Sequence, residues 1–316
     1  MKQAPVHGPA DKQASVRAFK MNSFMTPRAT PFPMQTTLRQ RGGALLAVMA
    51  VSLLAAGCDS VGTMASFKGA GVAEVEARSE ASSTNIASLT EVVQRNPNNP
   101  EPYNTRGAAY ARIGRFTEAV ADFSNAIRLD PNHAAAYTNR ALAYRQTGRD
   151  DAALADFNRA ISANPNHGPA YLGRANLERA RGDMQDALND LGQAIKLNPE
   201  AAPAFHARGL IYQRQGDHAH AITDFDNAID RDPFASAPYQ ARGQSLIATG
   251  KYDAAIEDFN ATLNVDNKNA DAWAGLGLAY ERQGNRAKAT ESYQRALTVD
   301  PSNRLAKDGQ SRNGRA

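Results

Sequence analysis

The sequence repeats itself every 34 residues between positions 100 and 303. Six copies align without a gap, at 100–133, 134–167, 168–201, 202–235, 236–269 and 270–303. A fixed period of this length is typical of chains that stack one small supersecondary unit after another, each packing against its neighbours. The period therefore predicts an array of like units rather than a closed globule.

Two amphipathic helices are predicted in each copy, because positions 4, 8 and 11 share one helical face and positions 20, 24 and 27 share another. Glycine at position 15 ends the first helix, since it adopts a left-handed backbone without steric cost. Proline at position 32 stops the second helix in five copies, and repeat 5 has Asn267 instead. The position-15 glycines are Gly114, Gly148, Gly182, Gly216, Gly250 and Gly284.

The copies resemble the tetratricopeptide repeat. Position 8 is always Gly or Ala, and position 4 is aromatic in Tyr103, Tyr137, Tyr171, Phe205, Tyr239 and Trp273. The resemblance implies an all-α fold, a right-handed superhelical solenoid of six helix-turn-helix repeats that binds proteins or peptides. Residues 85–99 resemble the second half of a preceding repeat, so we expect them to form an N-terminal capping helix.

The segment after the last repeat, 304–316, is predicted to be a short tail. Leu305 is its only large apolar residue. Repeat arrays need a capping helix over the last apolar face, and this tail offers little to cover it. We therefore expect the last repeat to dock against a second copy, forming a homodimer, or against a partner.

Arginine at position 7 departs from the family pattern, in which this position is usually apolar. The same five copies carry aspartate at position 23, and repeat 6 changes both residues together, to Leu276 and Ser292. Because the two helices of a repeat run antiparallel, positions 7 and 23 are expected to meet in a charge-assisted pair. Pairing across repeats would leave Asp258 opposite Leu276, so within-repeat pairing is predicted. The five structural pairs are Arg106–Asp122, Arg140–Asp156, Arg174–Asp190, Arg208–Asp224 and Arg242–Asp258.

The first-helix positions opposite the core, 2, 5, 9 and 12, are expected to line the concave groove of the superhelix. They combine amides, aliphatic side chains and two neighbouring arginines, which suits an extended peptide with an acidic side chain. The candidate binding residues are Asn104, Thr138, Leu142, Arg145, Leu172, Asn176, Arg179, His206, Leu210, Gln213, Gln240 and Gln244.

The first 57 residues have the features of a secretory signal. Arg39 and Arg41 precede an apolar run of 44–56, which is short for a membrane span. The sequence before Cys58 resembles a bacterial lipobox, which implies lipidation of Cys58 and a lipid anchor in the membrane. We expect residues 34–57 to be the signal peptide, with Met34, Met25 or Met21 as the start. Residues 1–33 are then a disordered or non-native extension, and 59–84 a flexible linker.

The charge distribution argues against a nucleic-acid partner. Residues 1–57 hold seven Lys or Arg against one Asp, so removing them from this chain of net charge +4 leaves the rest slightly acidic. No clustered acid and base groups or metal-ligand spacing is evident, so we expect no catalysis, cofactor or metal.

The chain resembles envelope repeat lipoproteins that assist pilus or secretin assembly, and others that gather cell-wall hydrolases. It is expected in the cell envelope, facing the periplasm from either membrane. A cytoplasmic scaffold is the alternative if the signal is not processed.

Overall fold

The computed structural model describes residues 85–314, and all regular structure in this part of the chain is helical. The extension 1–33, the signal 34–57, Cys58 and the 59–84 linker lie outside the described residues. One helix covers 85–95. The others are α2 (Pro100–Arg112), α3 (Phe116–Leu129), α4 (Ala134–Gln146), α5 (Asp150–Ala163), α6 (Gly168–Arg181), α7 (Met184–Leu197), α8 (Ala202–Arg214), α9 (His218–Arg231), α10 (Ser236–Ala248), α11 (Tyr252–Val265), α12 (Ala270–Gln283), α13 (Arg286–Val299) and α14 (Arg304–Gly314).

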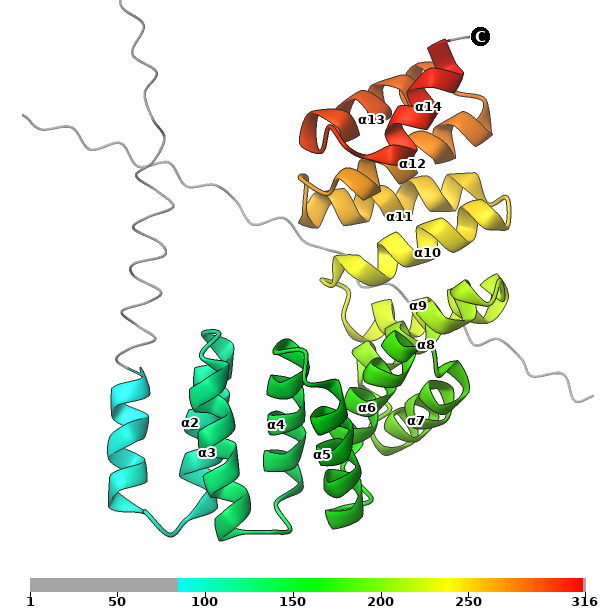
Figure 1. Cartoon of the computed structure of the whole chain (residues 1–316). Coiled ribbons are helices and arrows are strands. Elements are labelled where there is room, and N and C mark those ends of the chain that lie inside the picture. Colours follow the sequence, from blue (N-terminus) through cyan, green and yellow to red (C-terminus); the bar gives the residue numbers. More distant parts are fainter. Residues whose placement is uncertain (1–84, 315–316) are drawn as a thin grey trace, which may run out of the picture. The chain divides into compact units, whose positions relative to one another are not determined.

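Each 34-residue copy forms one pair of helices, and the pairs follow one another in chain order (Figure 1). The six position-15 glycines all have positive φ, from 70° to 96°, as the sequence predicts. The chain therefore forms the predicted all-α solenoid of tetratricopeptide-like repeats. Among the described residues, no helix is both long and apolar enough to span a membrane.

The end of each second helix is fixed by an Asp or Asn at position 31 as well as by proline. The side chain of this residue accepts a hydrogen bond from the backbone N–H two residues on in all six repeats. Asp266 makes this contact with Lys268 N at 3.0 Å in repeat 5, where proline is absent. This explains why α11 ends at the same repeat position as the other second helices.

The core of each repeat is an aromatic or leucine side chain at position 24 packed on a small residue of the first helix. Phe123 is fully buried, and a Cβ added to Gly107 would lie 2.7 Å from its ring. Phe225 packs in the same way on Gly209, at 2.6 Å. Position 8 must therefore stay small wherever the aromatic ring is present.

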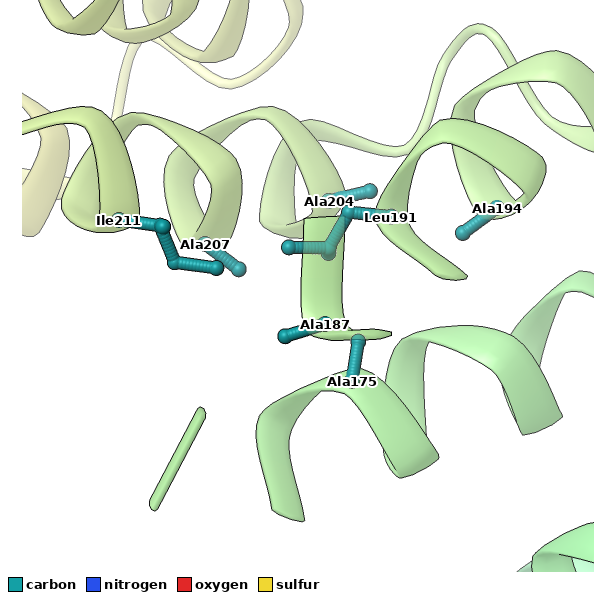
Figure 2. Close-up of a cluster of buried hydrophobic side chains, with 7 residues drawn as sticks. All are labelled: Ala175, Ala187, Leu191, Ala194, Ala204, Ala207 and Ile211. Carbon is teal, nitrogen blue, oxygen red and sulfur yellow. The ribbon is translucent and has the colours of Figure 1, made fainter. Parts of the chain in front are cut away.

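Neighbouring repeats share their cores. Figure 2 shows one such cluster, in which α7 side chains lie between α6 and α8. Its buried members are Ala175, Ala187, Leu191, Ala194, Ala204, Ala207 and Ile211. Most of them are alanines, so the helices approach closely and each junction depends on fit more than on bulk.

The tail after repeat 6 is not a poor cover, and the prediction made for it is wrong. Residues 304–314 form α14, which packs on α12 and α13. Ala306 is fully buried and Gly309 lies directly on the Tyr293 ring. Small residues cover the last repeat here because they let the helix backbone approach the aromatic ring. The reason for expecting a homodimer through this face is thereby removed.

Candidate functional site

The first helices line one side of the repeat array. Each first helix contacts the first helix of the next repeat, and α12 contacts the capping helix α14. Between Pro100 and Gly314, no two of the second helices α3, α5, α7, α9, α11 and α13 contact one another. The side on which neighbouring helices meet is the inner side of a curved stack. The surface of α2, α4, α6, α8, α10 and α12 at repeat positions 2, 5, 9 and 12 is called the inner face below.

Three predicted groove amides are used in hydrogen bonds within the chain, two of them to the next repeat and that of Gln240 to Asn269, the N-cap of α12. Gln213 Nε2 on α8 donates to Ala241 O at 2.8 Å and to Ser245 Oγ at 2.9 Å on α10. Asn104 Oδ1 accepts from Asn139 Nδ2 at 2.9 Å, and Gln240 Oε1 accepts from Asn269 Nδ2 at 2.9 Å. These bonds leave the three amides with less hydrogen-bonding capacity for a ligand.

Thr138 does not belong to the groove, and its assignment is corrected. Its side chain is only 3% exposed, and Oγ1 donates to Ala134 O at 2.9 Å. Position 5 lies at the edge of the first-helix contact, so a short side chain there is covered by the neighbouring helix. The sequence pattern alone placed all position-5 residues on the open stripe.

An apolar pocket opens on the inner face between α2 and α4. It has a volume of about 400 Å³, and α3 closes it from below through Phe116 and Phe123. The rest of its wall is mostly apolar, with the amides Asn139 and Gln146 among Ala108, Ala111, Leu142 and Ala143. Leu142 is 41% exposed, so its side chain is accessible to a ligand at the edge of the pocket. The pocket can receive one apolar side chain of a ligand.

A second pocket lies on the inner face at the other end of the array. It has a volume of about 340 Å³ and is lined by residues of α10, α12 and α14, including Gln244, Ile247, Leu278 and Leu305. Leu305 on α14, the only large apolar residue of the tail, thus lines a pocket at the end of the inner face. Between the two pockets, Leu172, Asn176 and Leu210 are half-buried.

Arg145 on α4, Arg179 on α6 and His206 on α8 form a cationic cluster in the middle of the inner face. Burial, and then the charge of Arg179, lower the pKa of Arg145, while Asp150 acts in the opposite direction. Burial and Arg179 also lower the pKa of the His206 imidazole. His206 packs against Phe225 with ring centroids 5.9 Å apart. The cluster brings positive charge into a partly desolvated surface.

All five predicted position-7 arginines bind the aspartate of their own repeat. In each pair Nε and Nη2 donate to the two carboxylate oxygens, at distances between 2.6 and 2.9 Å. The five aspartates are buried, with exposures of at most 5%. Bidentate geometry of this kind satisfies both oxygens of a buried carboxylate.

The same arginines also bind the preceding repeat, a contact that pair spacing alone did not predict. In four of the five, Nη1 bonds the position-25 side chain of the unit before. The contacts are Arg106 to Thr90, Arg140 to Ser124, Arg174 to Asn158 and Arg242 to Asp226. Arg208 has no such contact because Gly192 occupies position 25. A polar residue at position 25 opposite four of the five arginines was the available sequence signal.

Glu178 stands at position 11 of repeat 3. Its Oε1 lies 3.7 Å from Arg174 Nε, but that guanidinium is already bound to Asp190. Glu178 Oε2 is buried and has no hydrogen-bond partner among the described residues. Burial, then the charge of Asp190, raise the Glu178 pKa to about 7. It is a local weak point of the core rather than part of the inner face cluster.

No group of three or more His, Cys, Asp or Glu side chains with metal-binding geometry occurs within residues 85–314.

His133 accepts a hydrogen bond from Ala136 N and so caps α4.

Several solved structures share the fold. The Cut9–Hcn1 hetero-tetramer of the APC/C aligns with a TM-score of 0.64 and 20% identity over 73% of this chain; the chain spans 46% of the matched one. YrrB, described as a TPR protein with an unusual peptide-binding site, aligns at 0.52 and 23% identity over 60% of this chain and 97% of its own. PilW, described as a widely conserved type IV pilus biogenesis factor, aligns at 0.59 and 17% identity over 66% and 97%. At these identities the likeness concerns the fold alone.

No curated protein sequence matches the chain. Family models described as tetratricopeptide repeat match residues 104–168, 202–234 and 270–303, and one described as TPR repeat matches 175–216 and 243–284. Their combined extent is more than half of the chain, and it falls on the paired helices of the structure. The chain belongs to the tetratricopeptide repeat family.

Proposed function

We propose that the protein is a non-catalytic scaffold that binds an extended segment of a partner protein along its inner face. The observation that carries this proposal is the open apolar pocket between α2 and α4, with the exposed Leu142 in its wall, beside the cationic cluster. Apolar pockets combined with a few placed polar groups are the usual features of peptide-binding grooves. The description of YrrB as a peptide-binding TPR protein supports the same mode of binding.

Site-specific photocrosslinking tests the proposal. A photoreactive amino acid is placed at Leu142 on the inner face, at Leu210 further along it, and at Ala155, an exposed position on the second helix of repeat 2. If a partner segment lies along the groove, Leu142 and Leu210 will crosslink to neighbouring residues of the same peptide, located by mass spectrometry. Equal capture of that peptide from Ala155 would contradict the proposal.

We also propose that the scaffold works in the bacterial envelope, lipidated at Cys58, joined by the 59–84 linker and facing the periplasm. The support is the charged, apolar and small-residue order of 39–58, and the likeness in fold to PilW, a pilus biogenesis factor. Pilus or secretin assembly and the gathering of cell-wall enzymes are both compatible roles.

Metabolic labelling with a clickable palmitate distinguishes an envelope lipoprotein from a cytoplasmic scaffold, the alternative if the signal is not processed. Incorporation into the wild-type chain and its loss in Cys58→Ala are expected for the lipoprotein. A soluble, unlabelled, full-length wild-type chain would instead support the cytoplasmic scaffold. Membrane fractionation of the labelled protein then assigns the membrane.

A further inference from the structure

Two arginines of the inner face differ from every other half-buried arginine in residues 85–314. Eight arginines in this part of the chain are neither fully exposed nor buried, and six of them bond a carboxylate or a backbone carbonyl. Arg145 and Arg179 make no such contact with any described residue, and the Nε of Arg179 is shielded from solvent without a partner. A buried donor left unbonded costs stability, and an acceptor supplied by a ligand would remove that cost.

Two other polar side chains at repeat position 12, the position of Arg145 and Arg179, are hydrogen-bonded within the chain. Gln213 bonds the next first helix through its amide. Glu281 in repeat 6 receives two hydrogen bonds from Arg312 of α14, at 2.8 and 3.0 Å. Of the four polar side chains at position 12, those of repeats 4 and 6 are thus bonded to the following helix unit, and those of repeats 2 and 3 are not.

The neighbourhood of the two arginines favours an anion from outside the chain. α4 and α6 are in contact, so two like charges at equivalent positions are held near each other on a desolvated surface. Asp150 is the acidic group that acts on Arg145, and it is exposed at the start of α5 without bonding either arginine. Burial and Arg179 lower the pKa of His206, so most of the positive charge of the cluster comes from the two arginines. A carboxylate between the guanidiniums would relieve their repulsion and bond the free N–H groups.

The pocket next to this cluster limits how the anion is presented. Leu142 and Arg145 are three residues apart on α4, so they lie one helical turn apart. Neighbouring helix axes are about 8–10 Å apart, and an extended peptide advances about 3.3 Å per residue. A side chain in the α2–α4 pocket is thus about three residues from one between α4 and α6. The inner face continues past the cluster to Leu210 and the second pocket, so the peptide passes through rather than ending there.

We propose that the partner segment places an internal Asp or Glu side chain between Arg145 and Arg179, and an apolar side chain, about three residues away, in the α2–α4 pocket. The inference rests on the proposed groove function and adds the sequence preference of its ligand. Charge-assisted bonds to two arginines supply most of the preference for an acid, and the apolar anchor fixes the register.

A selection from random decapeptides tests this. The full-length lipid-free chain (Cys58→Ala, detergent-solubilised) is offered one library with both peptide ends embedded in constant sequence and another with a free carboxyl terminus. We expect the embedded library to be enriched in Asp or Glu with Leu, Ile, Val or Phe three residues away. Arg145→Glu plus Arg179→Glu is expected to lower the affinity of selected peptides at least about tenfold and to remove the acidic preference on reselection. Arg112→Glu plus Arg214→Glu, exposed arginines of other first helices, is the matched control and is expected to leave both unchanged.

The outcomes separate this inference from the proposed function. Enriched peptides without an acidic residue, whose binding is lost in Leu142→Asp, would overturn the acid site and leave the groove function intact. Enrichment in the free-terminus library alone would overturn the internal side chain. Failure to enrich any sequence would overturn both. Arg145→Lys plus Arg179→Lys keeps both charges and is a control for misfolding of the Glu variants. It is expected to retain the preference for an acidic residue with weaker affinity, since lysine lacks the bidentate fork of arginine. Loss of that preference in a folded Lys variant would contradict the site.

Discussion

Arg208 donates from Nε and Nη2 to the two carboxylate oxygens of Asp224, each at 2.8 Å, and joins the two helices of repeat 4 through their buried faces. The hydrogen bonds that Arg208 donates to Asp224 are the main cause of a raised Arg208 pKa. Four other repeats have the same pair. Repeat 6 replaces it with Leu276 and Ser292, both buried, which shows that the site can be filled without charges.

Breaking this pair on one side is expected to destabilise the protein more than removing both partners. Arg208→Leu leaves Asp224 buried and uncompensated, at a cost of about 3 kcal/mol. Adding Asp224→Ser recreates the repeat 6 combination and is expected to recover a large part of that loss. Urea unfolding followed by circular dichroism measures both. A double variant as unstable as Arg208→Leu alone would show that the pairing contributes little to the loss.

The hydrogen bond that Arg208 of repeat 4 lacks to position 25 of repeat 3 is predicted to form when Gly192 is replaced by a polar residue. Gly192 leaves open space where other repeats place a polar side chain that bonds the arginine, and a Cβ there meets nothing within 4 Å. Gly192→Asn is expected to stabilise the chain by about 1 kcal/mol, through helix propensity and a new bond to Arg208 Nη1. The gain should shrink in the Arg208→Leu, Asp224→Ser background. An equal gain in both backgrounds would assign it to the helix alone.

Glu178 should make stability depend on pH. Its pKa is raised from 4.5 to about 7 in the folded chain, mainly by burial and then by Asp190. The folded state therefore holds a proton that the unfolded state has released, and stability falls as pH rises from about 4.5 to about 7. Glu178→Gln is expected to flatten this fall by about 1 to 3 kcal/mol. Thermal melts at several pH values measure it, with the exposed Glu200→Gln as control; an unchanged slope in Glu178→Gln would contradict the assignment.

Deleting residues 304–316 is expected to uncover the last repeat. α14 buries Ala306, places Gly309 on Tyr293 and holds Glu281 through Arg312. The shortened chain should melt several degrees lower and self-associate with rising concentration, because an apolar face is exposed. Arg312→Ala, which removes the ion pair alone, should melt close to wild type and stay monomeric in light scattering. A shortened chain that is equally stable and monomeric would show that α14 is not a cap.

Repeat boundaries, helix pairs, left-handed glycines and the five Arg–Asp pairs were predictable from the sequence. Each depends on spacing within 34 residues, and a regular array repeats its contacts at the same spacing. The correlated change at Leu276 and Ser292 identified the partners without any structure.

The tertiary structure alone decided how the repeats contact one another. Thr138 is buried, Gln213 is hydrogen-bonded to α10 and Arg140 to Ser124, and the tail forms a capping helix. These outcomes depend on how closely two helices approach, which is set by the sizes of side chains on both and not by a period in either. For the same physical reason, only the folded chain shows that Arg145 and Arg179 lack the partners that other half-buried arginines have.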